Sequence, residues 1–156
     1  MSFFILMTPT KQPAPKFKVK RSLSGLGLFA TDFIKKGDFI IEYCGQQISQ
    51  KEIDEKISCK YLFEINSRKT IDGSSRSNTA RYINHSCRPN AEVEIKKGHV
   101  LIFAKKNICP EEEITYDYGR EYWNEYIKPI GCRCEKCLNL KSSNKNLAQK
   151  RRSCKK

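Results

Sequence analysis

The segment at residues 81–90 constrains the fold of this chain more than any other stretch. It reads Arg-Tyr-Ile-Asn-His-Ser-Cys-Arg-Pro-Asn. Apolar Tyr82 and Ile83 precede an amide, an imidazole, a hydroxyl and a thiol, and Pro89 stops a regular helix or central strand from continuing. We therefore expect a segment that is packed at one end and exposes specialised side chains at the other. Taken alone, it would also suit a turn with a hydrogen-bonded histidine.

Two later stretches complement this segment. Residues 113–119 read Glu-Ile-Thr-Tyr-Asp-Tyr-Gly, and residues 132–137 read Cys-Arg-Cys-Glu-Lys-Cys. With Gly25-Leu26-Gly27 upstream, the order and spacing of these motifs resemble the SET-domain family of protein lysine methyltransferases, including the cysteine-rich post-SET segment of many members. The resemblance covers residues 17–137, and no pre-SET cysteine segment is expected before it.

Many short apolar runs separated by turn residues predict a β-rich domain with few helices. We expect strands at 17–20, 28–30, 39–43, 61–65, 70–72 and 114–118, a hairpin over 93–104, a helical turn at 79–83, and helices at 50–58 and 121–127. The resemblance implies the rest: a β-rich α+β SET-domain fold of small β-sheets with a pseudoknot, followed by a short zinc-binding post-SET segment.

The length of 156 residues suits one domain with tails. We expect a flexible N-terminal arm at 1–16, the SET domain at 17–127, the post-SET zinc segment at 128–140 and a basic disordered tail at 141–156. The net charge is +13, but residues 1–21 and 138–156 hold twelve of the 30 basic residues and no acidic ones, so 18 basic and 17 acidic residues remain between them. The ends are therefore expected to contact polyanions or nucleosomes.

Eight cysteines occur without a recognisable signal peptide or a long apolar stretch that could span a membrane. We expect a soluble, intracellular protein with no membrane partner, in which clustered cysteines favour metal over disulfides. If it acts on histones, it should be nuclear or associated with chromatin. The oligomeric state is not predicted.

The resemblance implies transfer of a methyl group from S-adenosyl-L-methionine to a lysine amine. The amine must be uncharged, and deprotonating a free lysine at pH 7 costs about 4 to 5 kcal/mol. A narrow aromatic channel and the positive charge of the methyl donor both disfavour the ammonium form. In the resemblance, Tyr118, Tyr116 and Tyr43 are the catalytic tyrosines, and Phe63 lines the substrate channel together with Tyr43 and Tyr116. A tyrosine at position 116 favours mono- or dimethylation.

The remaining site residues are also implied by the resemblance. The residues that match the cofactor-binding set are Gly25, Leu26, Gly27, Tyr61, Arg81, Asn84, His85, Tyr122 and Trp123. Structural zinc is coordinated by four ligands, and the matching thiols belong to Cys87, Cys132, Cys134 and Cys137. Only two residues separate the last two cysteines where the family usually has four.

Two other functions compete with this interpretation. A zinc-stabilised, basic nucleic-acid or chromatin-binding module without catalysis would explain the cysteines and the basic ends, but not the tyrosines. A nucleophilic Cys87 with His85 as its base is a third hypothesis, and a spacing of two should make their hydrogen bonding awkward. For the enzyme, the expected partner is an extended lysine-containing segment of a histone tail, and a non-histone protein is the alternative substrate.

Overall fold

The computed structural model describes residues 15–55 and 60–138. Predictions for residues 1–14, 56–59 and 139–156, including most of the N-terminal arm, the end of the first helix and the basic tail, lie outside the described residues. The strands are β1 (Phe17–Ser22), β2 (Gly25–Ala30), β3 (Phe39–Tyr43), β4 (Gln46–Ile48), β5 (Leu62–Asn66), β6 (Lys69–Asp72), β7 (Asn84–His85), β8 (Ala91–Lys96), β9 (His99–Ala104) and β10 (Glu113–Tyr116). The helical elements are α1 (Gln50–Asp54), the 3₁₀ turn η1 (Thr79–Tyr82), α2 (Arg120–Tyr122) and the π turn η2 (Trp123–Ile127).

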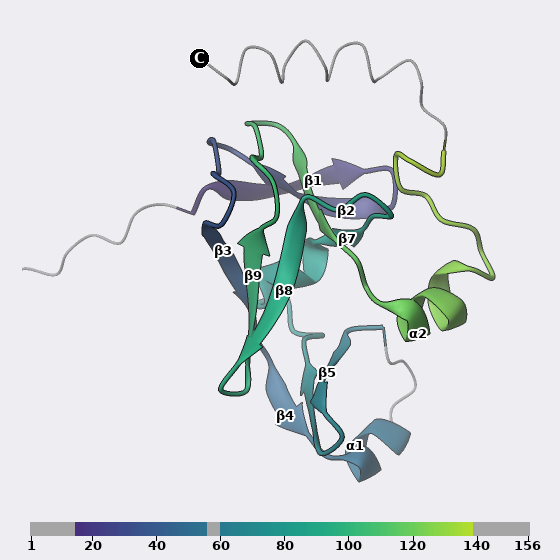
Figure 1. Ribbon diagram of the computed structural model, residues 1–156. Helices are drawn as coiled ribbons and strands as arrows, with labels where there is room; N and C mark the ends of the chain where they lie inside the picture. The colour runs from purple at the N-terminus through teal and green to yellow at the C-terminus, as the bar shows by residue number, and fades with distance from the viewer. Residues whose placement is uncertain (1–14, 56–59, 139–156) are drawn as a thin grey trace, which may run out of the picture.

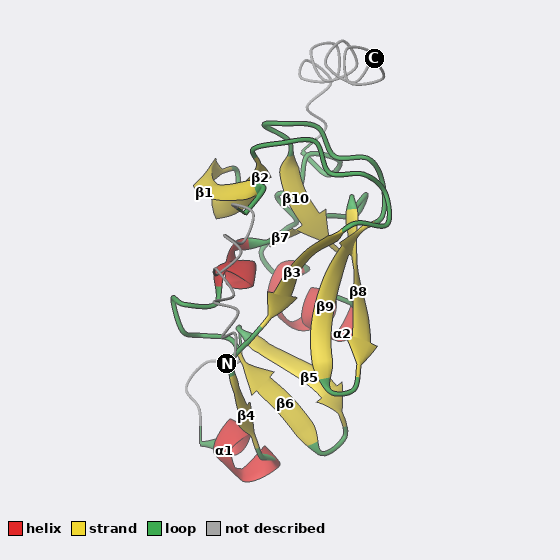
Figure 2. Ribbon diagram, turned by 90° about the vertical axis from the view of Figure 1, so that its left-hand side faces the viewer, coloured by secondary structure: helices red, strands yellow, loops and turns green. Residues whose placement is uncertain are grey.

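The strands form three small sheets with the orders β1-β2-β10-β7, β3-β9-β8 and β4-β6-β5. Figure 1 shows α2 and the chain that follows it passing beside β7 and β2, on one side of the molecule. The β4-β6-β5 sheet lies with α1 at the opposite end from β1 and β2 (Figure 2). Strands from distant parts of the sequence therefore surround the central segment.

The core is formed where these sheets meet. Leu28 of β2 lies opposite Ile114 of β10, and both side chains are fully buried, as is Ile83 just before β7. Residues of β9 alternate between buried and partly exposed, as expected for a strand with one covered face. Burying an aliphatic side chain of this size stabilises the fold by about 1.5–3 kcal/mol. This packing fixes the strand ends that position the site.

The pairing of β7 with β10 determines where the central polar residues lie. The two strands are parallel, with Asn84 opposite Thr115 and His85 opposite Tyr116. Beyond the ladder, the backbone N–H of Ser86 donates to the Tyr116 carbonyl at 3.0 Å. Two motifs that are separated by about thirty residues in the chain are thus held side by side by main-chain hydrogen bonds.

Most of the predicted elements are confirmed, with four differences. The first helix, predicted at 50–58, ends at Asp54 with Glu55 as its C-cap. The strand predicted to reach Tyr118 ends at Tyr116, because the Asp117 carboxylate accepts a hydrogen bond from the Gly119 N–H and Gly119 has a φ of 87°. The predicted helix at 121–127 is one α turn followed by a π turn. Strands β4 and β7 were not predicted, since three and two residues are too short for a periodic pattern.

Candidate active site

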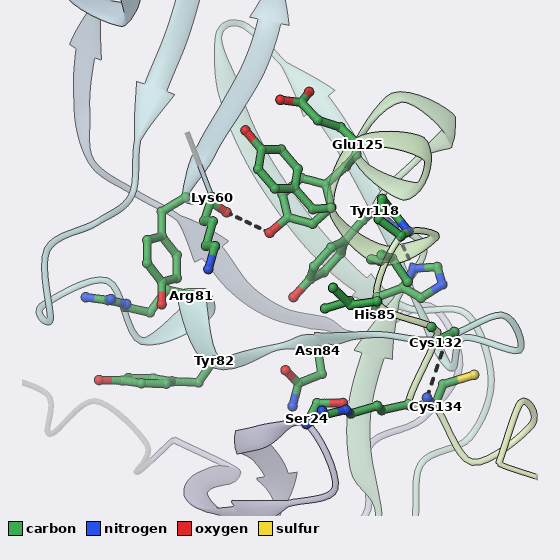
Figure 3. Close-up of a pocket in the computed structure, with 18 of the residues that line it drawn as sticks. Ser24, Lys60, Arg81, Tyr82, Asn84, His85, Tyr118, Glu125, Cys132 and Cys134 are labelled. Atoms are coloured by element: carbon green, nitrogen blue, oxygen red, sulfur yellow. Dashed lines mark hydrogen bonds between the residues drawn. The ribbon is translucent and has the colours of Figure 1, made fainter. Parts of the chain in front are cut away.

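A cavity of about 690 Å³ lies between the central segment and the C-terminal part of the chain. The N-terminal strands contribute Ser24 and Leu26 to its lining, while residues 129–134 form much of the opposite side. Figure 3 shows Ser24 and Asn84 at one end of this cavity and Glu125 at the other, with Cys132 and Cys134 along one side. The cavity therefore needs both halves of the chain. We call it the large cavity.

A second, narrower cavity of about 80 Å³ adjoins the large one. Its lining includes all four predicted channel and catalytic residues: Tyr43, Phe63, Tyr116 and Tyr118. Five residues line both cavities: Lys60, Tyr61, Arg81, Tyr118 and Tyr122. We call the narrow space the aromatic channel and the volume beside the five shared residues the junction.

Tyr118 lies at the junction in a fixed orientation. Its hydroxyl donates a 2.7 Å hydrogen bond to the Ile83 carbonyl, and its ring contacts Tyr116 and Tyr122 at centroid distances of 4.9 and 4.8 Å. Burial raises the pKa of Tyr118 and also that of Tyr116, because a phenolate is poorly solvated there. Both tyrosines therefore remain neutral phenols at physiological pH.

Tyr43 and Phe63 form another part of the channel wall, with ring centroids 5.5 Å apart. The Tyr43 hydroxyl donates to the Tyr61 carbonyl at 2.8 Å, and burial raises its pKa. A side chain at Gly73 would collide with the Tyr43 ring, so the absence of a Cβ there makes room for the tyrosine. The width of the channel is thus set by packed side chains as well as by backbone.

Asn84 is held by two polar groups of the four-stranded sheet. Its Nδ2 donates to the Leu26 carbonyl at 3.0 Å and to Glu113 Oε1 at 2.8 Å, while Ser22 donates to the other Glu113 oxygen at 2.8 Å. Since both partners of Nδ2 can only accept, the orientation of the amide is determined, and Oδ1 remains for the large cavity. A Cβ at Gly27 would meet Glu113, so this glycine clears space for the carboxylate.

His85 contacts the aromatic residues on the other side of the site. Its Nδ1 accepts a 3.2 Å hydrogen bond from the Tyr118 backbone N–H, and its ring lies 5.3 Å from that of Trp123. Burial lowers the pKa of His85, which Asp117 at 3.7 Å partly offsets. A neutral imidazole that accepts at Nδ1 carries its proton on Nε2. His85 therefore fixes the turn that presents Tyr118.

Arg81 contributes the guanidinium at the junction. Its charged end lies 4.1 Å from the centroid of the Tyr61 ring and 5.5 Å from that of Tyr82, and it donates a hydrogen bond to the Ser74 carbonyl. Contacts of a guanidinium with aromatic rings and with a carbonyl hold it in place. A fixed positive charge therefore lies beside both cavities.

Four thiols converge at the edge of the large cavity. The Sγ atoms of Cys87, Cys132, Cys134 and Cys137 all lie within 4.8 Å of one another. Two of the separations from Cys87 are 3.9 Å to Cys132 and 3.6 Å to Cys137, and tetrahedral Zn–S bonds of about 2.3 Å imply S···S distances of about 3.8 Å. The cluster could thus bind a metal ion, and the shortened spacing between the last two cysteines does not prevent the convergence.

The pKa values of the thiols agree with this geometry. Burial and the neighbouring thiols raise the pKa of Cys87, and burial raises that of Cys132 to about 11. For Cys134, burial acts in the same direction, but backbone N–H donors outweigh it and bring the pKa to about 7. A cation would favour the thiolate forms that the crowding of four thiols disfavours.

The third hypothesis from the sequence makes Cys87 a nucleophile and His85 its base. The expectation that a spacing of two hinders a contact between His85 and Cys87 is wrong, because the imidazole Nε2 lies 3.5 Å from Cys87 Sγ. The geometry is possible since residues 86–87 turn back beyond β7. However, the raised pKa of Cys87 is the opposite of what a nucleophilic thiol requires.

Most of the predicted cofactor residues surround the large cavity. Its lining includes Leu26, Tyr61, Arg81, Asn84, His85 and Tyr122. Gly25, Gly27 and Trp123 do not line it, and their roles toward a cofactor stay predictions. Sequence reasoning missed several lining residues: Ser24, Lys60, Tyr82, Glu125, Tyr126 and Arg133. Of these, Tyr126 could have been found, since it follows Tyr122 by four residues in a predicted helix.

Comparisons with known proteins agree with this site. The SET-domain family model matches residues 25–119, which include β2, the central segment, β10 and both channel tyrosines of the later motif. The chain therefore belongs to the SET-domain family. Its described part has the small sheets and few helices of that fold, and a cluster of four cysteines joins Cys87 of the matched region to three cysteines that follow it.

Several curated proteins are similar in sequence. The chain is 41% identical to histone-lysine N-methyltransferase ASHH1 of Arabidopsis thaliana over 113 residues, which cover 64% of this chain and 23% of that protein. It is 36% identical to histone-lysine N-methyltransferase trithorax of Drosophila melanogaster over 132 residues, covering 75% and 4%. For histone-lysine N-methyltransferase set1 of Dictyostelium discoideum, the values are 35% over 147 residues, covering 85% and 10%.

The chain thus spans less than a quarter of the length of these three relatives. Among the described residues, no helix is both long and apolar enough to cross a membrane.

Proposed function

We propose that this chain is an S-adenosyl-L-methionine-dependent protein lysine N-methyltransferase that acts on a histone lysine. The observation that carries the proposal is the narrow aromatic channel that meets the large cavity at Tyr118. A donor and an acceptor that enter from different sides would meet at this junction. The similar proteins are named histone-lysine N-methyltransferases, which supports a histone substrate and hence action in the nucleus.

The large cavity offers groups that suit the methyl donor. When bound, the donor supplies an activated methyl group on a sulfonium. The Asn84 Oδ1 is the free acceptor of a fixed amide and would bind an ammonium group, as would main-chain carbonyls nearby. The Tyr61 and Tyr122 rings would provide apolar contacts for flat or aliphatic parts of the ligand.

The aromatic channel suits a lysine side chain. Tyr43, Phe63 and Tyr116 would contact the aliphatic stem, and their rings exclude water from the amine. Desolvation and the Arg81 guanidinium at the junction both favour the uncharged amine over the ammonium, so that water can accept the released proton without a side-chain base. The Tyr118 hydroxyl, held by Ile83, would orient the methyl group through weak contacts to oxygen.

The four thiols would hold a structural zinc ion. This ion would tie residues 132–137 to the central segment through Cys87, next to His85 and Tyr118. We propose that it completes the wall of the large cavity and takes no part in the transfer. Contact of the basic ends of the chain with nucleosomes also stays a prediction.

Mass spectrometry of histones after incubation with the protein and S-adenosyl-L-methionine tests the proposed reaction. The Tyr118→Phe variant should lose transfer by about 100-fold or more while it retains most of its donor affinity, because the hydroxyl acts on the reacting methyl group. The variant His99→Gln changes an exposed residue and controls for effects of producing and purifying a variant. Equal turnover in wild type and Tyr118→Phe would remove Tyr118 from the mechanism. Methylation of other lysate proteins but no histone would replace the proposed substrate.

The degree of methylation is set, in this proposal, by Tyr116. A hydroxyl at the buried end of the channel leaves little room for a third methyl group, so wild type should stop at the mono- or dimethyl product. Replacing Tyr116 by Phe removes that oxygen, and we expect the product distribution in the same mass spectra to shift toward trimethyllysine. A distribution that does not change would mean that other residues limit the volume.

A further inference from the structure

One lysine of the chain itself lies where the two cavities meet. Lys60 lines both the large cavity and the aromatic channel, and among the described residues it is the only lysine that lines either. Figure 3 shows its side chain pointing into the cavity, between Arg81 and Tyr118. Lys60 is exposed, which fits a side chain that projects into an open volume. Its amine therefore lies near the volume in which the proposed reaction would occur.

The backbone of this lysine is held in place on both sides of the junction. The Lys60 carbonyl accepts a 3.2 Å hydrogen bond from the Tyr122 hydroxyl, and the carbonyl of the next residue, Tyr61, accepts the 2.8 Å bond from Tyr43. The amine is connected to this anchored backbone by a four-carbon stem alone. Its local concentration at the junction is consequently high, and no second molecule has to bind.

The groups around Lys60 are those expected to surround an acceptor amine. Tyr61, Tyr118 and Tyr122 line the same two cavities and contribute aromatic rings, which stabilise a methylated cation as well as an unmethylated one. Arg81 lines the same two cavities, and its guanidinium lies 4.1 Å from the centroid of the Tyr61 ring. The surroundings of Lys60 therefore differ from those of an ordinary surface lysine.

We propose that Lys60 is a methyl acceptor, so that the protein methylates itself within one molecule. The inference rests on the proposed function, since it uses the same methyl donor and the same tyrosines. The lone pair of the uncharged Lys60 Nζ forms a bond to the methyl carbon while the bond from that carbon to the sulfonium sulfur breaks. The electron pair remains on sulfur as a thioether, and one proton leaves the amine for water.

An intramolecular reaction has a kinetic signature that separates it from transfer between molecules. Each protein molecule carries its own acceptor, so the fraction labelled at a given time does not depend on the protein concentration. Lys60 would also compete with an external lysine for the junction, and labelling at Lys60 should slow when a histone substrate is added in excess.

The experiment uses the full chain and S-adenosyl-L-methionine with a trideuterated methyl group, without a histone. Peptide mass spectrometry should locate the label at Lys60, with the same first-order rate constant when the protein is diluted by about tenfold. Lys60→Arg should lose this label and Tyr118→Phe should lose it by about 100-fold, whereas Lys36→Arg, which changes an exposed lysine outside both cavities, should keep it. Circular dichroism verifies that each variant is folded.

Several outcomes would overturn the inference. Label at other lysines only, or a rate constant that falls with dilution, would show transfer between molecules. Histone methylation without label at Lys60 would leave the proposed function standing and remove Lys60 as an acceptor. If calorimetry found that Lys60→Met only weakens donor binding and wild type carried no label, Lys60 would be a binding residue. Absence of transfer to both acceptors would overturn the proposed function itself, and this inference with it.

Discussion

The two walls of the large cavity are built in different ways. On one wall, Asn84 lies in a strand of the four-stranded sheet, and a carboxylate and a backbone carbonyl hold its side chain. On the other wall, residues 129–134 follow a single α turn and a π turn and pair with no strand. Contacts of this C-terminal wall with the rest of the domain include the thiol cluster and, from the preceding turns, Tyr122 with the Lys60 carbonyl and Trp123 with His85.

The difference predicts which part of the site would depend on the metal ion that we propose for the thiol cluster. The sheet wall is held by main-chain ladders and buried side chains, so it should form whenever the domain folds. The C-terminal wall has few buried apolar residues, and four thiols without a cation hold it only weakly. The affinity for a ligand that contacts both walls should therefore depend on the metal, whereas folding of the sheets should not.

Removal of the metal should have the largest effect. A strong chelator, or Cys132→Ser, is expected to reduce methyl transfer by about 100-fold or more, because the C-terminal wall is no longer held against the central segment. The strand signal in circular dichroism should persist, and the metal content is measured by mass spectrometry. Mutation of Cys44, an exposed free cysteine outside the cluster, provides the control. Full activity in metal-free protein would contradict this division of the site.

The sheet wall is tested by a smaller change at Glu113. Glu113→Ala leaves the Asn84 amide without one of its two fixed acceptors, and donor affinity measured by calorimetry should fall by about tenfold, or ~1.4 kcal/mol. Glu113→Gln is the matched control. Its amide oxygen can still accept from Asn84 and its NH₂ can donate to the Ser22 hydroxyl, so most of the affinity should return. Equal losses in both variants would mean that charge, not hydrogen bonding, is what Asn84 requires.

The contact between the walls through Tyr122 should have the smallest effect. Tyr122→Phe removes only the hydrogen bond to the Lys60 carbonyl and keeps the edge-to-face contact of the ring with Tyr118. A hydrogen bond of this kind contributes about 0.5–1.5 kcal/mol, so KM for the donor or the peptide should rise by a small factor with little change in kcat. Tyr122→Ala also removes the ring and should cost more. A Phe variant as impaired as the Ala variant would show that the hydroxyl has another role.

Much of the architecture could be predicted from the sequence, because residues 91–96 and the stretch around Ile114 alternate between apolar and polar residues, while residues 100–104 and the stretch around Leu28 are short apolar runs beside turn residues. The meeting of Tyr43 with Tyr116 could not be predicted from periodicity. It depends on how β3 and β10, which belong to different sheets, pack together, and only the family resemblance implied it.

The parts that were missed share a physical cause. Strand β7 has two residues and is a strand only because β10 pairs with it, so its sequence carries no strand signal. Lys60 is exposed and has no apolar pattern, and its position at the junction follows from the tertiary structure. Similarly, nothing in the sequence shows that Gly27 makes room for Glu113, because the two positions become neighbours only through pairing of β2 with β10.

The central position of β10 between β2 and β7 has a consequence for biosynthesis. The strands on either side of it leave the ribosome long before it does, and their shared sheet cannot close until residues 113–116 have been made. Tyr118 and the cluster cysteines Cys132, Cys134 and Cys137 emerge later still. A nascent chain therefore cannot form the proposed reaction centre until β10 and Tyr118 have been made, and a fragment truncated before β10 is expected to have no partial activity.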